Sequence, residues 1–253
     1  MSRFLASVRS AAEAALTLAG GADIIDAKEP AAGALGRVSP AVLRAIVAGV
    51  AGRVPVSATI GDVELRPETV CAAVASTSDD GVDIVKIGVF PGDLEGTLSA
   101  LRPMTAKGIR LVAVLFADRA PDLVGIPARC AEAGFHGVML DTAGKSSGPL
   151  TAHQHREALA GFVARARSLG LVSGLAGSLR LADIPGLASL GADYLGFRSA
   201  LTAGERQGDL DPAALRAVRQ ALERSSATAA AGAMSATRAA REGGAATTLS
   251  KLR

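Results

Sequence analysis

The sequence is poor in the residues that build metal centres, disulfides and surfaces for stacking nucleic-acid bases. It has two cysteines and three histidines, and aromatic residues make up 3% of the chain. Cys71 and Cys130 lie in separate expected helices without the close spacing of metal ligands, and we interpret them as small buried side chains. His153 and His155 stand two positions apart on one expected helix, so they face in different directions. We therefore expect no metal ion and no cofactor.

Long apolar runs are also missing. No stretch approaches the roughly 20 residues of a membrane span, although apolar residues make up 49% of the chain and are ample for a core. The first residues lead directly into a strand-like run, with no pattern of a secretory signal. These absences predict a cytoplasmic protein with no membrane partner.

Excess positive charge is confined to the end of the chain. The net charge is +3, and residues 225–253 carry all of it. That segment is rich in alanine, serine, threonine and glycine, a composition typical of disorder. The rest of the chain is neutral overall and has few aromatic residues, so we expect no nucleic-acid partner.

Lysine is scarce. The chain has five lysines (Lys28, Lys86, Lys107, Lys145 and Lys251) against 22 arginines. A chain that uses arginine for solvation keeps a lysine where it needs an amine that can lose its proton. Lys28 and Lys86 each stand at the end of an apolar run, and Lys145 follows another. We expect these lysines to meet in one site.

Eight apolar, β-branched-rich runs alternate with helical patterns. Runs that are apolar on both faces predict a parallel sheet covered by helices. Eight units in about 225 residues match the count and size of an α/β fold of the (β/α)8 TIM-barrel type, with an open doubly wound sheet as the alternative. We predict a TIM-barrel catalytic domain over residues 1–224 and a disordered tail over residues 225–253. The expected strands are Phe4–Val8, Asp23–Lys28, Val54–Ile60, Asp83–Val89, Leu111–Ala117, Gly137–Asp141, Leu171–Ala176 and Asp193–Phe197. The expected helices are Ala11–Ala19, Pro40–Val50, Pro67–Ser76, Leu94–Ala106, Pro121–Ala133, Thr151–Ser168, Leu181–Ser189 and Pro212–Arg224.

A weak repeat marks the entry to every second expected strand. Residues 21–23, 81–83, 134–136 and 191–193 each combine a glycine that ends a helix with a polar residue that opens a strand. The repeat favours a closed barrel with approximate fourfold character. It is also common chemistry for helix-to-strand loops, which is the simpler interpretation.

The alternation of side chains along a strand predicts which residues point into the barrel. In the second expected strand the apolar face fits against helices, so Asp26 and Lys28 point inward. The same reasoning turns Lys86, Asp141 and Arg198 inward on three other strands. Because catalytic groups of this fold lie at the carboxyl ends of the strands, we expect these residues at one rim.

Charged groups at inward positions are unfavourable unless they are paired or used. One interpretation is a buried ion network that closes the top of the barrel. The other is an amine-dependent site, because crowding and partial desolvation lower the pKa of a lysine and free its amine for Schiff-base chemistry. In that site Asp26 and Asp141 relay protons or balance the charge.

Glycines gather at the ends of the seventh and eighth expected strands. Glycine lets backbone N–H groups approach an anion, and the loops after these strands are the usual phosphate site of the fold. Simple tight turns are the alternative. The candidate phosphate-binding residues are Gly174, Gly177, Ser178, Gly196, Arg198 and Ser199.

The third expected strand also ends at this rim. Thr59 and Asp62 lie at its carboxyl end, where they could contact the substrate. For Asp62, a role in capping a loop or helix fits the sequence equally well.

Five motifs together resemble the (5-formylfuran-3-yl)methyl phosphate synthases, also called 4-(hydroxymethyl)-2-furancarboxaldehyde phosphate synthases. The resemblance spans about residues 3–224 in order and does not cover the tail. The motifs are Gly-Gly-Ala-Asp-Ile-Ile-Asp-Ala-Lys-Glu-Pro (20–30), Ser-Ala-Thr-Ile-Gly-Asp (57–62), Val-Lys-Ile-Gly (85–88), Met-Leu-Asp-Thr-Ala-Gly-Lys (139–145) and Leu-Ala-Gly-Ser (175–178).

The resemblance implies a lyase of methanofuran biosynthesis that joins two molecules of glyceraldehyde 3-phosphate, loses phosphate and water, and closes a furan ring. It implies that Lys28 forms the Schiff base and that Lys86 accepts protons. Asp141 and Lys145 match the family's aspartate and later lysine. The expected partner is thus a small phosphorylated substrate, and we expect a homo-oligomer because barrels often self-associate.

Two other functions remain open from the sequence. One is another Schiff-base aldolase of sugar phosphates. The other is a non-catalytic barrel that binds a phosphorylated metabolite. Whether Asp26 relays protons or only balances charge is open in all cases.

Overall fold

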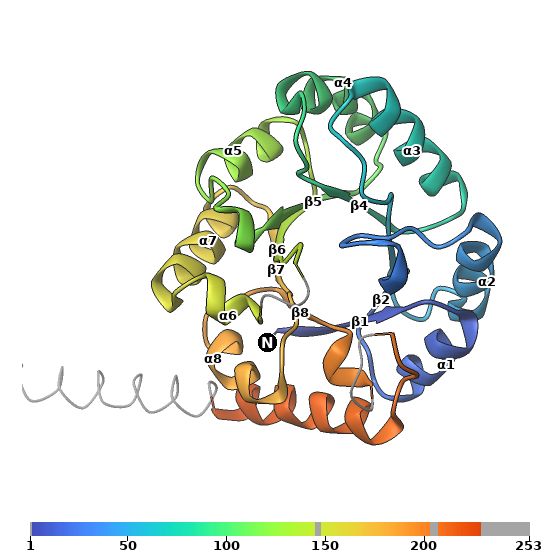
Figure 1. Ribbon diagram of the computed structural model, residues 1–253, viewed down its shortest axis with the longest axis vertical. Helices are drawn as coiled ribbons and strands as arrows, with labels where there is room; N and C mark the ends of the chain where they lie inside the picture. The colour runs from blue at the N-terminus through green and yellow to red at the C-terminus, as the bar shows by residue number, and fades with distance from the viewer. Residues whose placement is uncertain (1, 145–147, 203–206, 229–253) are drawn as a thin grey trace, which may run out of the picture.

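A computed structural model describes residues 2–144, 148–202 and 207–228. Its parallel strands pair in chain order and the last strand returns to the first, so the sheet closes into a barrel. Figure 1 looks along the barrel, with the strands in the middle and the helices in a ring around them. The predicted (β/α)8 barrel is confirmed, and the open doubly wound sheet is excluded. The strands are β1 (Arg3–Val8), β2 (Ile24–Ala27), β3 (Val56–Thr59), β4 (Ile84–Gly88), β5 (Leu111–Phe116), β6 (Gly137–Asp141), β7 (Val172–Leu175) and β8 (Tyr194–Phe197).

The helices begin where the sequence offers capping groups. The Ser10 and Ser39 hydroxyls each accept a hydrogen bond from an N–H of the first turn, which satisfies a group that the helix leaves unpaired. The helices are α1 (Ala11–Ala19), α2 (Pro40–Val50), α3 (Pro67–Asp79), α4 (Leu94–Ala106), α5 (Gly125–Glu132), α6 (Leu150–His153), α7 (Arg156–Ser168) and α8 (Ile184–Ala188), with short 3₁₀ turns at Pro30–Ala32, Ala117–Arg119, Leu181–Asp183 and Ser199–Leu201.

Five expected helices differ from the structure in their bounds. The third continues to Asp79 rather than ending at Ser76, and the one expected over Leu181–Ser189 starts as a 3₁₀ turn and becomes α8 at Ile184. The helix expected from Pro121 begins instead at Gly125, because the Asp122 carboxylate accepts the Gly125 N–H and holds the preceding residues in a turn. The helix expected over 151–168 is broken at Gln154, whose backbone is extended. His153 and His155 therefore lie on either side of that break, and the argument that placed them on one helix was wrong.

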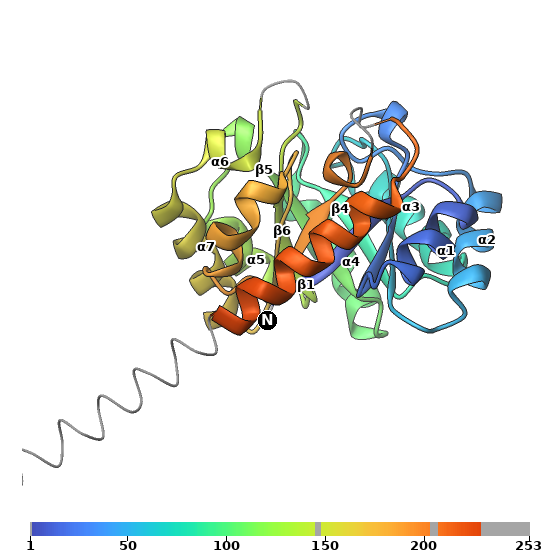
Figure 2. The same ribbon diagram turned by 90° about the horizontal axis from the view of Figure 1, so that it is seen from below.

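The last helix runs from residue 212 to residue 228 in the described part of the chain. It crosses the outside of the barrel (Figure 2), and Arg219 ties it to the end of α1 through the Gly21 carbonyl. Residues 225–228 are thus helical, which corrects the predicted start of the tail at 225. The rest of the predicted tail, residues 229–253, lies outside the described residues.

The repeated glycines and aspartates have a common structural task. Gly21, Gly81, Gly134 and Gly191 all have positive φ, a conformation that glycine adopts without strain. At three of the four repeats, the aspartate carboxylate that opens the even strand accepts an N–H from the odd strand before it, at 2.7 to 2.8 Å. The repeat therefore joins neighbouring strands at the amino end of the barrel.

The apolar side chains form two buried clusters. The larger cluster lies between the sheet and the helices. The smaller one lines the inside of the barrel and includes Leu5, Ile24, Val112, Met139 and Tyr194. The charged residues that follow on the same strands lie above this inner cluster, at the carboxyl ends.

Candidate active site

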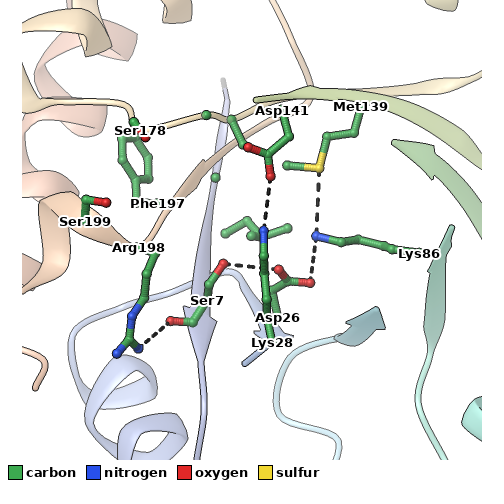
Figure 3. A pocket seen from close by; sticks show the side chains of 14 residues that line it. Ser7, Asp26, Lys28, Lys86, Met139, Asp141, Ser178, Phe197, Arg198 and Ser199 are labelled. Carbon is green, nitrogen blue, oxygen red and sulfur yellow. Dashed lines mark hydrogen bonds and ion pairs between the residues drawn. The ribbon is translucent and has the colours of Figure 1, made fainter. Parts of the chain in front are cut away.

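Two lysines and two aspartates from three even-numbered strands meet above the inner cluster. Asp26 lies on β2 and Lys28 directly follows that strand, while Lys86 lies on β4 and Asp141 ends β6. Figure 3 shows the four side chains pointing toward one another. The structure thus brings together four of the five residues that strand alternation predicted to converge; the fifth, Arg198, lines the same pocket but pairs with Glu13.

The first ion pair joins Lys28 to Asp141. The Lys28 Nζ lies 3.1 Å from the Asp141 Oδ2, and the two side chains are 7% and 6% exposed. The other carboxylate oxygen of Asp141 accepts the Thr142 N–H at 2.7 Å. Both members line the pocket at the mouth of the barrel. The Lys28 amine is therefore held by one carboxylate at the border of this pocket.

The second pair, between Lys86 and Asp26, is deeper. The Lys86 Nζ lies 2.8 Å from the Asp26 Oδ1, and the side chains are 3% and 0% exposed. Asp26 also accepts the Ser57 hydroxyl at 2.6 Å and the Ser7 hydroxyl at 3.1 Å. The Met139 sulfur lies 3.8 Å from Lys86 Nζ. Asp26 therefore accepts three hydrogen bonds, from Lys86, Ser57 and Ser7, which fix its orientation.

Burial lowers the pKa of Lys86 below its ordinary value. The nearby Asp26 opposes this effect by favouring the ammonium form, while the positive charge of Lys28 adds to it. The net direction favours a neutral amine at lower pH than for an exposed lysine. Such an amine is suited to accept protons.

The pocket at the carboxyl ends of the strands is here called the upper pocket. The two ion pairs form one side of it, and the ends of β7 and β8 form the other (Figure 3). Its lining residues include Ser7, Asp26, Lys28, Lys86, Met139, Asp141, Gly177, Ser178, Gly196, Arg198 and Ser199.

Most of the candidate phosphate-binding residues line the upper pocket, but Gly174 does not. A Cβ atom at Gly174 would lie 2.3 Å from the Tyr194 ring, so the glycine makes room for that ring. Gly177 has a φ of +107°, and a Cβ atom there would lie 2.9 Å from Thr142. Gly177 and Ser178, which also has positive φ, form the tight turn that faces the pocket.

Arg198 is held from behind the pocket. Its guanidinium pairs with Glu13 of α1 at 2.5 Å and donates to the Ser7 and Gly208 carbonyl oxygens at 3.2 and 2.9 Å. Figure 3 shows its side chain turned away from the two lysines. Arg198 therefore lies at the rim of the pocket, and its ion pair with Glu13 and its hydrogen bond to Ser7 connect β8 to α1 and β1.

The loop after β6 is positioned by Asp118. Its carboxylate accepts the N–H groups of Ala143 and Gly144 at 2.8 and 2.6 Å. Burial raises the pKa of Asp118, but these hydrogen bonds outweigh it and the pKa is lowered. The next residue, Lys145, lies outside the described residues.

Asp62, one of the two further candidates, has a structural role. Its carboxylate accepts the N–H groups of Ala34 and Leu35 at 2.9 and 2.7 Å, so it caps the loop after β2. Thr59 is fully buried and donates to the Gly36 carbonyl oxygen at 3.0 Å. Both residues shape the loop behind Lys28.

The sequence did not identify four residues that the structure places in or beside the site. These residues are Ser7, Ser57, Met139 and Glu13. Strand alternation places Ser7 and Ser57 inward beside Asp26, so the same reasoning applied to polar residues would have found them. Glu13 gave no such signal, because it lies on a helix and its partner is far along the chain.

No group of three or more histidine, cysteine, aspartate or glutamate side chains that could hold a metal ion occurs in residues 2–144, 148–202 and 207–228. In the same part of the chain, every helix is too short or too polar to cross a bilayer.

Known proteins resemble this chain at two levels. Solved structures share the fold: a phosphoribosyl anthranilate isomerase from Thermus thermophilus gives a TM-score of 0.62 at 16% identity, covering 88% of this chain and 98% of that one. A thiamine phosphate pyrophosphorylase from Pyrococcus furiosus gives 0.60 at 13% identity, covering 88% and 96%. At these identities the likeness shows a common barrel and nothing about the reaction.

Sequence relatives are much closer. A Methylorubrum extorquens protein, provisionally named (5-formylfuran-3-yl)methyl phosphate synthase, is 49% identical over 222 residues, or 87% of this chain and 90% of the relative. Proteins with the same name from Methanopyrus kandleri and Methanosarcina mazei are 37% and 34% identical, covering 85% and 81% of this chain and 94% and 92% of their own lengths. Residues 4–219 match the family described as 4-HFC-P synthase. The chain therefore belongs to the 4-HFC-P synthase family.

Proposed function

We propose that this protein is a lyase that condenses two molecules of glyceraldehyde 3-phosphate into (5-formylfuran-3-yl)methyl phosphate through a Schiff base on Lys28, as a step toward methanofuran. The atoms balance when one phosphate and two water molecules leave. The names of the relatives support the product. The observation that carries the mechanism is the pair of lysines in one pocket, each with its own carboxylate.

In this proposal Lys28 is the amine that attacks the carbonyl of one triose phosphate. It borders the upper pocket, and Asp141 at 3.1 Å is placed to take the proton that the amine loses on attack. The iminium that forms draws electrons from the neighbouring carbon, so a proton on that carbon becomes removable.

Lys86 accepts that proton. Its lowered pKa leaves the amine ready to take a proton, and Asp26 stabilises the ammonium that results. The enamine then attacks the aldehyde of the second triose, and later proton transfers expel phosphate and water as the ring closes. Gly177, Ser178 and Ser199 face the lysines and hold a phosphate group through backbone N–H and hydroxyl groups.

The test is incubation of the purified full chain with glyceraldehyde 3-phosphate alone. The proposal predicts a new near-ultraviolet absorbance from the conjugated furan aldehyde and one phosphate released per furan formed. A sugar bisphosphate without absorbance or phosphate release identifies another Schiff-base aldolase. Stabilisation by the substrate without turnover identifies a binding protein, and either result overturns the proposal.

A further inference from the structure

A second cavity lies inside the barrel, beneath the two ion pairs. We call it the lower chamber; its volume is about 130 Å³. Its lining begins with Arg3, Pro55, Arg110 and His136 at the amino ends of their strands, where the two arginines are exposed. It ends at buried Lys86. The chamber thus leads from the amino-terminal face of the barrel to the amine of the deeper pair.

Lys86 lies between the two cavities. Leu5 and Lys86 are the residues shared by the linings of the upper pocket and the lower chamber in the described part of the chain. Ser57 also lines the chamber and donates its hydroxyl to Asp26. The deeper pair therefore faces the substrate pocket on one side and the chamber on the other.

The lower chamber contains a polar group with no protein partner. Tyr194 is 3% exposed as a residue, and its hydroxyl takes part in no hydrogen bond among residues 2–144, 148–202 and 207–228. The hydroxyl oxygen is not one of the fully enclosed unpaired atoms, so it borders the open space of the chamber, where a hydrogen-bond partner would stabilise it. Burial, reinforced by the negative charge of Asp26, raises the pKa of Tyr194, so the phenol keeps its proton and can donate it.

Water in the chamber can supply the hydrogen bond that the Tyr194 hydroxyl lacks. A buried water needs about 10–15 Å³ of such space and two or more polar partners. The chamber offers that volume several times over, and it offers Tyr194, Ser57 and Lys86 as partners. Gly174 makes the arrangement possible, because a Cβ atom at that position would lie 2.7 Å from the Tyr194 hydroxyl oxygen.

We propose that the lower chamber holds a chain of water that carries protons between Lys86 and the amino-terminal face of the barrel, with the Tyr194 hydroxyl as its fixed link. The step is a proton transfer without redox change. The substrate carbon gives a proton to the Lys86 amine, and the resulting ammonium passes one proton to the adjacent water molecule. The row of water molecules then releases one proton to solvent at the amino-terminal face of the barrel. Tyr194 is a positioning residue, since it acts through water on Lys86.

This proposal rests on the proposed function, and Tyr194→Phe tests it because the change keeps the ring and removes only the hydroxyl. We expect kcat to fall about tenfold with KM unchanged. The solvent deuterium isotope effect on kcat should rise, and borohydride trapping at Lys28 should stay at the wild-type level. A merely structural hydroxyl would not change the isotope effect.

Ser173→Ala is the matched control. Ser173 lies on β7 beside Gly174, but its hydroxyl bonds Asp193 at 2.9 Å and does not line the chamber. This variant should keep the wild-type kcat and isotope effect. Tyr194→Phe with the kcat and isotope effect of the wild type would overturn the proposal.

A high-resolution crystal structure gives a readout that needs no activity. We expect ordered water within hydrogen-bond distance of the Tyr194 hydroxyl and, directly or through another water, of Lys86 Nζ. A dry chamber overturns the relay even if the furan is formed. Absence of furan from the wild-type protein instead overturns the proposed function, so the two failures are distinguishable.

Discussion

The two lysine–aspartate pairs differ in depth and in what surrounds the carboxylate. In the upper pair, Asp141 accepts the Thr142 N–H as well as pairing with Lys28, and Lys28 borders the upper pocket. In the deeper pair, Asp26 is fully buried and accepts two serine hydroxyls besides Lys86. The same residue types therefore form a pair that borders the pocket above and a fully buried pair below. The different roles that we propose for the two amines rest on this difference in surroundings.

Removal of the upper amine should have the largest effect. Lys28→Arg keeps the positive charge beside Asp141 but cannot form a Schiff base, because a guanidinium does not lose its proton. We expect kcat to fall on the order of a thousandfold or more, with the melting temperature near that of the wild type. The rate of furan formation and a thermal melt measure the two quantities. Activity within tenfold of the wild type would remove Lys28 from the mechanism.

Removal of the deeper amine should slow proton transfer and also destabilise the fold. Lys86→Met is expected to lower kcat about a hundredfold and the free energy of unfolding by about 3–5 kcal/mol, because Asp26 is left buried without its partner. The matched control is the double variant Asp26→Asn/Lys86→Met, which removes both charges. It should regain most of the stability in urea denaturation but none of the activity. If stability and activity return together, the deeper pair is structural only.

The deeper pair should also change how stability depends on pH. Because the pKa of Lys86 is lowered from 10.5, the native amine loses its proton at a pH where the unfolded chain still holds it. Between the lowered pKa and 10.5 the unfolded state binds more protons, so the free energy of unfolding rises with pH. Burial raises the pKa values of Cys130 and Tyr194, and these two groups lower the free energy of unfolding in the same alkaline range. The contribution of Lys86 is therefore measured as a difference: in urea denaturation from neutral to alkaline pH, the stability of the wild type relative to the double variant should rise. Identical slopes would mean that the pKa of Lys86 is not lowered.

The smallest effect is expected from the hydroxyls that hold Asp26. Ser57→Ala removes the bond of 2.6 Å and should cost about 1 kcal/mol of stability, with a few-fold loss of kcat. Ser7→Ala removes the longer bond of 3.1 Å and should have a weaker effect on both. The reverse ranking would show that Ser57 does not orient the deeper carboxylate.

Much of the barrel was predictable because its signals are local. The apolar runs, the proline and serine starts of helices, and the closing glycines each depend on a few neighbouring residues, and every predicted strand is present. The boundaries that failed depend on contacts. The helix α5 begins at Gly125 rather than Pro121 because the Asp122 carboxylate accepts the Gly125 N–H. The last helix continues past Arg224 to residue 228.

The site was predictable as a set of residues but not as a set of bonds. Alternation along the strands brings Asp26, Lys28, Lys86 and Asp141 to one rim, as the structure shows. It does not tell which carboxylate holds which amine. Asp26 and Lys28 lie on one face, about 7 Å apart along the chain, and each pairs with a residue of another strand. Arg198 was predicted as a phosphate ligand, and its pairing with Glu13 depends on how α1 packs, which no local pattern encodes.

Borohydride trapping tests the difference between the two pairs most directly. The wild-type protein is reduced in the presence of glyceraldehyde 3-phosphate, and the modified peptide is identified by mass spectrometry. The account predicts a reduced adduct on Lys28 in the wild type and in Lys86→Met, and none in Lys28→Arg. An adduct on Lys86 alone, or furan formation without any adduct, would contradict the assignment of Lys28 as the Schiff-base amine.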